Sequence, residues 1–256
     1  MTPVLVSTAA GIGRITLNRP EQLNAVNVEL GVGLERAIKL LGSDPSVNVI
    51  LIRGASGNFC AGGDFAEVER LREHGPAALR TLFAAFRRAC EAIAQVEVPV
   101  VAAVEGVAAA GGFELMQAAD IVLVSEDARI ADNHIRFGMI PGGGSTQRLP
   151  RLIGRQQALA VLLSGDRLSG ADAVRLGLAY RGFPRAEFDE EITRFVSAMA
   201  GRERSALSTI KRLVMSGLDK PLAAGLDDEI SAVVNHISDG AGRNGASAFT
   251  QRGGTR

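Results

Sequence analysis

The stretch VAAVEGVAAAGGFELMQAAD, residues 101–120, decides the fold of this chain. Its first half consists of small and β-branched residues except for Glu105, and this pattern predicts an apolar strand. The glycine pair Gly111-Gly112 follows, and the apolar residues after it predict a helix that carries Glu114 in its first turn. A strand that leads almost directly into a helix is typical of an α/β domain.

The same alternation of strands and helices extends from this stretch towards both ends of the chain. The hydrophobic spacing predicts strands at 48–54 and 98–106 and helices at 27–41, 82–96 and 151–165. Residues 64–80 are charged and contain Gly75-Pro76, which indicates a broken helix or a mobile segment. Residues 131–150 are expected to form a loop, and the chain from Glu187 onward has a helical pattern. The prediction is an α/β domain followed by a C-terminal helical region.

Composition excludes several classes of function. The 256 residues contain 28 basic and 28 acidic side chains, so no global field favours nucleic acid or an anionic membrane as a partner. The two cysteines, Cys60 and Cys90, form no CxxC motif or Cys/His cluster, which argues against a disulfide framework or a zinc site. The N-terminus lacks a signal-peptide pattern, and no apolar run reaches the ~20 residues of a membrane span. We therefore expect a cytoplasmic protein.

Two glycine pairs stand where a strand gives way to a helix. One lies in Ala61-Gly62-Gly63-Asp64, and the other is Gly111-Gly112. Glycine lets the backbone approach a ligand closely, and the amide groups of a first helical turn have no partner within the helix. If the two sites converge, one amide from each can hold a negative charge that develops on a carbonyl oxygen. The alternative is that the glycines serve only tight turns and close packing.

Glu114 has two interpretations as well. A carboxylate in the first turn of a helix is stabilised by the helix macrodipole whatever its function. Its neighbours Phe113, Leu115 and Met116 are apolar, however, and a buried carboxylate with a raised pKa suits a general base near neutral pH.

Five ordered motifs resemble the crotonase superfamily, the enoyl-CoA hydratase/isomerase family. They are LNRPEQLNAVN, FCAGGDF, PVVAAVEGVAAAGGFELMQAAD, FGMIPGGGSTQRLPRLIG and LSGDRLSGADAVRLGLAY, within residues 15–180. The resemblance implies a crotonase-like spiral of repeated ββα units at 1–185 and a C-terminal helical trimerisation region at 186–256. It also implies a homotrimer or homohexamer that acts on acyl-CoA thioesters, without a cofactor beyond the coenzyme A of the substrate.

The resemblance also assigns residues to the site. It implies that the backbone amides of Gly63 and Gly111 form an oxyanion hole around the thioester carbonyl. Residues that it places along the CoA channel are Gln22, Asn24, Ala25, Ala61, Asp64, Phe65 and Ala66. Phe249 would cover the adenine of a neighbouring subunit.

The chain departs from the family at one informative position. Hydratases of this family use two glutamates; Glu114 matches the first, and His134 occupies the place of the second. Histidine exchanges protons near neutral pH, so Glu114 with His134 as its partner predicts hydration of a 2-enoyl-CoA. Asp132 is an alternative acid. Isomerase, hydrolase or lyase chemistry at the same site stays open, as does a non-catalytic acyl-CoA binder, and the acyl chain is not predicted.

Overall fold

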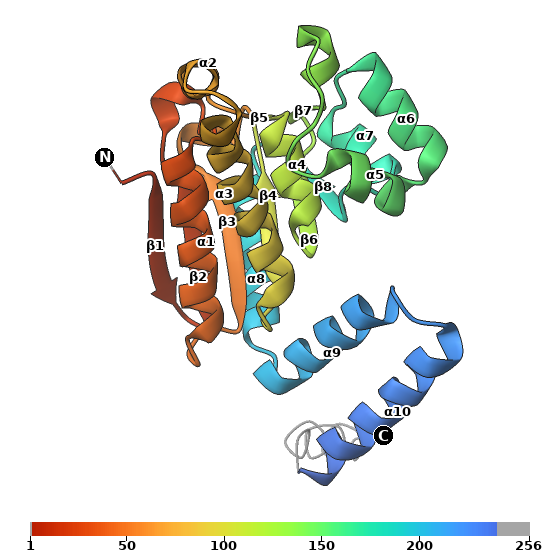
Figure 1. Cartoon of the computed structure of the whole chain (residues 1–256). Coiled ribbons are helices and arrows are strands. Elements are labelled where there is room, and N and C mark those ends of the chain that lie inside the picture. Colours follow the sequence, from red (N-terminus) through yellow and green to blue (C-terminus); the bar gives the residue numbers. More distant parts are fainter. Residues whose placement is uncertain (1, 240–256) are drawn as a thin grey trace.

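The computed structural model describes residues 2–239, whose core is a sheet flanked by helices (Figure 1). Within this range the main sheet has six strands in the order β1-β2-β3-β4-β6-β8. Only β1 and β2 pair antiparallel; the other neighbours are parallel. The strands are β1 (Val4–Ala9), β2 (Ile12–Leu17), β3 (Val49–Gly54), β4 (Val100–Val104), β6 (Ile121–Ser125) and β8 (Arg181–Phe183).

A second, smaller layer lies at the carboxyl ends of the main strands. It contains β5 (Val107–Ala109) and β7 (Arg129–Ala131), which pair in parallel, and a bridge from Cys60 to Ala108 extends it. Main strands are thus followed first by a short strand or bridge of this layer and then by a helix. This repetition is the predicted spiral of ββα units.

The helices within residues 2–239 cover both faces of the main sheet. They are α1 (Val28–Ser43), α2 (Phe65–Glu73), α3 (Pro76–Gln95), α4 (Gly111–Ala118), α5 (Ser145–Ile153), α6 (Arg155–Ser164), α7 (Gly170–Arg175), α8 (Phe188–Ala200), α9 (Arg204–Gly217) and α10 (Leu222–Ser238). Short 3-10 helices are η1 (Pro20–Gln22), η2 (Ala55–Gly57) and η3 (His134–Phe137).

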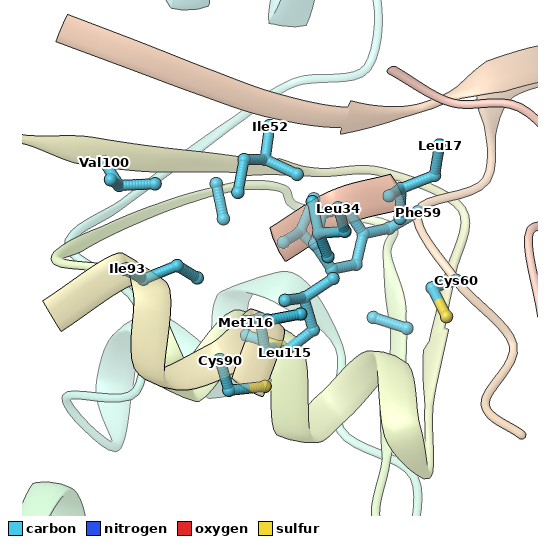
Figure 2. Close-up of a cluster of buried hydrophobic side chains, with 14 of the residues drawn as sticks. Leu17, Leu34, Ile52, Phe59, Cys60, Cys90, Ile93, Val100, Leu115 and Met116 are labelled. Carbon is cyan, nitrogen blue, oxygen red and sulfur yellow. The ribbon is translucent and has the colours of Figure 1, made fainter. Parts of the chain in front are cut away.

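The core explains why the central strands β3 and β4 are mostly apolar. Alternate residues of β3 enter different clusters, with Ile50 and Ile52 on one face and Val49 and Leu51 on the other. Figure 2 shows the first cluster, where Ile52 lies with side chains of α1, α3 and α4. The second cluster is closed by the apolar face of α8. A parallel strand covered on both faces needs such a continuous run.

Of three predicted segments, one agrees with the structure and two differ. Residues 64–80 form the predicted broken helix, with α2 and the start of α3 separated at Gly75, whose φ is +89°. The single helix expected at 151–165 is two helices, because Gly154 adopts a φ of +80°. The loop expected at 131–150 contains η3 and most of α5.

The last two helices described project away from the sheet (Figure 1). None of their residues is buried, and α9 is attached to the core by two cations. Arg204 donates to the carbonyls of Gly42 and Asp44 at 2.9 and 2.8 Å, and the Lys211 ammonium lies 2.7 Å from Asp120. By contrast, α8 packs on the sheet although it follows the predicted domain boundary at residue 185. No helix within residues 2–239 is long and apolar enough to cross a bilayer.

Candidate active site

The two glycine turns meet, as the convergence hypothesis requires. A Cβ atom placed on Gly111 would lie 3.5 Å from the Cα of Gly62 and 3.6 Å from the amide nitrogen of Gly63. Gly111 is the first residue of α4, and neither its amide nor that of Gly63 has an acceptor among the described residues. Two unpaired N–H groups therefore stand side by side, on a loop and on a helix start.

Close packing and exposure of these amides depend on the same glycines. A Cβ atom on Gly112 would lie 2.0 Å from the Cys60 carbonyl oxygen, so no side chain fits there. Gly62 has a φ of +115°, and Ala110 is held in the left-handed region at +46°. The packing interpretation and the ligand interpretation of the glycine pairs are thus compatible.

Glu114 is the buried carboxylate expected from its neighbours, with 2% of its surface exposed. Its Oε1 atom accepts hydrogen bonds from the amides of Gly143 at 2.7 Å and Ser145 at 3.2 Å. Its Oε2 atom accepts none from the described residues, so this oxygen is free for a ligand or water. Burial raises the pKa of the Glu114 carboxyl, against the lowering effects of the Ser145 amide, the charge of His134 and the Gly143 amide.

The glycine-rich segment that holds Glu114 packs directly on α3. A Cβ on Gly142 would come within 2.6 Å of the Phe83 ring, and one on Gly143 within 2.3 Å of the Phe86 ring. Without side chains, this backbone fits between the two rings and Glu114 and presents its amides to the carboxylate. The sequence analysis did not assign this role; three consecutive glycines before a helix were the available signal.

His134 faces the same cavity as Glu114, from the start of η3. Its Nδ1 atom lies 2.7 Å from Oδ1 of Asp132, and 13% of its side chain is exposed. Burial alone would lower the pKa of His134, but the hydrogen bond and charge of Asp132, with the charge of Glu114, outweigh it and raise the pKa. Asp132, the alternative acid of the sequence analysis, does not line the cavity, and its carboxylate contacts Nδ1 of the His134 ring.

One cavity of about 270 Å³ joins the predicted groups. Gly63, Gly111, Glu114 and His134 all line it, together with Ala61 and Phe65 from the predicted CoA channel. The rest of the wall is almost entirely apolar: Val26, Val68, Leu82, Phe83, Phe86, Ala110, Asn133, Phe137, Met139 and Ile140. Such a wall excludes water and strengthens electrostatic interactions inside the cavity.

A family model described as enoyl-CoA hydratase/isomerase matches residues 7–255, nearly the whole chain. The chain belongs to the enoyl-CoA hydratase/isomerase family. This membership confirms the resemblance found in the five motifs.

Individual members of the enoyl-CoA hydratase/isomerase family are similar to this chain over most of their length. The mitochondrial enoyl-CoA hydratase of Pongo abelii is 32% identical over 94% of this chain and 81% of that protein. The crystal structure of an enoyl-CoA hydratase from Bacillus anthracis superposes with a TM-score of 0.92 at 28% identity, covering 98% of this chain and 96% of that one. A peroxisomal Delta(3,5)-Delta(2,4)-dienoyl-CoA isomerase of Arabidopsis thaliana is 29% identical over 86% of this chain and 83% of its own length.

Two residues predicted to line the CoA channel by family resemblance have side-chain partners within the chain. The Asn24 side chain is fully buried, accepts from the Arg19 amide, and donates to the carbonyls of Ala55 and Asn58. Asp64 caps α2 through the Glu67 amide and pairs with Arg19 at 2.7 Å. Their side chains hold the loop rather than face the cavity.

Three further residues predicted to line the CoA channel, Gln22, Ala25 and Ala66, are absent from the cavity wall. Gln22 ends η1 and is exposed, Ala25 is buried, and Ala66 is exposed in the first turn of α2. Phe249 lies outside the described residues.

Arg19 was not predicted as a site residue, yet it connects this region. Besides pairing with Asp64, it donates to the Ala25 carbonyl at 2.5 Å. Its position within the motif LNRP was the only sequence signal.

Proposed function

We propose that the protein is an enoyl-CoA hydratase that adds water across the α,β double bond of a 2-enoyl-CoA thioester. The observation that carries this proposal is the meeting of two unpaired amides, Glu114 and His134 around one cavity. Hydration needs all of these: donors for a developing enolate oxygen, a base for water and an acid for the α-carbon. Family membership supports the same class of substrate.

The amides of Gly63 and Gly111 would bind the thioester carbonyl oxygen. As water attacks the β-carbon, the π electrons move towards this oxygen, and an enolate develops there. Backbone amides that are already oriented stabilise that charge more in the transition state than in the substrate, which lowers the barrier. Their unpaired state is what supports this role, because no protein acceptor competes with the ligand.

Glu114 and His134 would move the protons. Oε2 of Glu114 has no protein donor and would accept a hydrogen bond from the attacking water, whose proton it takes as the C–O bond forms. His134 would deliver a proton from Nε2 to the α-carbon, completing the C–H bond and neutralising the enolate. The sum is the addition of one H₂O, and proton exchange with solvent restores both side chains. Only protein groups and the thioester take part, so we propose no further cofactor.

Assembly and location remain part of the proposal. The exposed apolar side chains of α9 and α10 support a homotrimer or homohexamer, because a face that no part of residues 2–239 covers is suited to another subunit. The large apolar residues most exposed here are Ile210, Leu222, Ile230 and Ile237 on the helices and Leu218 between them. A cytoplasmic location is supported by the free thiols of the buried Cys60 and Cys90.

A panel of 2-enoyl-CoA and saturated acyl-CoA thioesters, followed by mass spectrometry, tests the reaction. We expect at least one 2-enoyl-CoA to gain the mass of water, with loss of the absorbance of the conjugated thioester. Release of free CoA would point to hydrolysis, and a shifted double bond without mass change would point to isomerisation. If the thioesters of the panel bind but none gives a product, a non-catalytic acyl-CoA binding protein would be the only remaining interpretation.

The pH dependence of kcat/KM should be bell-shaped, with both limbs displaced upward. Glu114 must be ionised to act as a base, so its raised pKa places the acidic limb above the ordinary glutamate value of 4.5. His134 must be protonated to act as an acid, so its raised pKa places the alkaline limb above 6.5. Initial rates at low substrate concentration measure both limbs. Activity that rises through neutral pH without an alkaline limb would contradict the role of His134.

A further inference from the structure

Asp132 and His134, which lines the cavity, form a hydrogen-bonded pair. Asp132 is the first residue after β7, and His134 begins η3, with only Asn133 between them. Asn133 has φ −98° and ψ 12°, a conformation that turns the chain between the two side chains. The result is the 2.7 Å contact between Asp132 Oδ1 and His134 Nδ1. Such a short contact is typical of a charge-assisted hydrogen bond.

The histidine ring is the only side-chain partner of this carboxylate among the described residues. The Asp132 side chain is 1% exposed, and its Oδ2 atom is buried without a hydrogen-bond partner there. A buried carboxylate without an opposite charge is strongly unfavourable. Burial of Asp132 beside the ring therefore favours the imidazolium form of His134.

The contact also determines which nitrogen is left for the cavity. An ionised carboxylate only accepts hydrogen bonds, so Nδ1 of His134 carries a proton and Nε2 is the nitrogen that can exchange one with a ligand. Two carboxylates act on the charge of the ring, Asp132 from its own loop and Glu114 from α4. The nearby Arg136 extends to Asp166, at 3.4 Å, and not to the ring.

We propose that Asp132 is a positioning residue that fixes the His134 ring through Nδ1 and keeps Nε2 protonated until each turnover. With this partner, a histidine can act at the position where the family's hydratases use a glutamate. This proposal rests on the proposed hydratase function for the step that uses the proton. A glutamate at position 134 would not need such a partner and would be repelled by it. The two residues therefore act as a unit in this chain.

Histidine NMR tests the pairing without any assay of turnover. The full chain has three histidines, so ¹³C,¹⁵N-histidine labelling with a His134→Gln variant assigns the signals of His134. We expect Nδ1 to be protonated and the pKa of His134 to lie above 6.5 in the unaltered protein. In Asp132→Asn the pKa should fall by about one unit or more. An unprotonated Nδ1 in the unaltered protein, or an unchanged pKa in the variant, would overturn the proposal even if the enzyme hydrates nothing.

Asp132→Asn, made both in the protein with His134 and in the His134→Glu variant, distinguishes a positioning role of Asp132 from a purely structural one. With His134 present, Asp132→Asn should lower kcat/KM by roughly 10- to 100-fold and move the alkaline limb to lower pH. In His134→Glu, the same change should raise kcat/KM, because it removes one of two adjacent buried carboxylates. A decrease of similar size in both backgrounds would show that Asp132 supports only the fold. Asp166→Asn is the matched control: this exposed carboxylate belongs to the same region, and its loss should leave the alkaline limb in place.

Discussion

Glu114→Gln is expected to lower kcat/KM for the best 2-enoyl-CoA by roughly 10²–10⁴-fold, the range typical of a lost general base. The amide is nearly isosteric with the carboxylate, and its oxygen can still accept from Gly143 and Ser145, which hold Oε1 at 2.7 and 3.2 Å. The nitrogen that replaces Oε2 cannot take a proton from water. Steady-state hydration rates compared with the unaltered protein measure the loss.

Binding and folding should change little in this variant, because the two amides next to the cavity are untouched. Calorimetric titration with a saturated acyl-CoA should give nearly the same affinity, and the thermal midpoint should be similar. Glu91→Gln on α3 is a suitable control, since Glu91 lies outside the cavity and pairs, among residues 2–239, only with Arg87 at 2.6 Å. A loss of less than tenfold for Glu114→Gln would mean that this side chain is not the base.

Much of the fold could be predicted because its signals are local. The strands β3 and β4 are buried on both faces, and a continuous apolar run is the direct consequence of that environment. The convergence of the two glycine turns could be stated only as a condition, because no local pattern brings Gly63 to Gly111. That contact depends on the bridge between Cys60 and Ala108, which joins residues far apart in the sequence.

The site was harder to predict where one residue type serves two purposes. Asn24 and Asp64 lie in motifs that resemble a CoA channel, yet their side chains satisfy buried backbone groups and a helix end. Polar residues at turns perform both tasks, and the sequence does not distinguish them. The individual residues Phe83 and Phe86 of the apolar wall were not identified, because they follow an ordinary helical spacing.

Asp132 illustrates a third limit. Next to His134 in the sequence, it was an equally acceptable acid if the loop shifted by two residues. Only the three-dimensional contact distinguishes a side chain in the cavity from one behind its neighbour.

Gly111→Pro should reduce kcat/KM by at least 10²–10³-fold, the cost typical of removing one oxyanion donor. Proline lacks the backbone N–H that this position presents to the cavity, while its ring is tolerated at the first residue of a helix. Gly111 has room for a Cβ atom, whose nearest neighbours would lie at 3.5 Å, so the expected defect is chemical rather than steric. Single-turnover rates, measured with circular dichroism to verify folding, report the loss.

Arg155→Pro is the matched control. Arg155 is the first residue of α6, as Gly111 is of α4, and each follows a small residue, Gly154 or Ala110. Arg155 lies outside the cavity. Proline there deletes an equivalent amide at an exposed position away from the cavity, so the hydration rate should stay within about twofold of that of the unaltered protein. Comparison of the two variants separates the loss of one particular N–H from the general effect of proline at a helix start. A folded Gly111→Pro protein that retains more than a tenth of the rate would exclude this amide as a donor to the thioester oxygen. It would also exclude an oxyanion hole as the explanation for the meeting of the two glycine turns near Glu114.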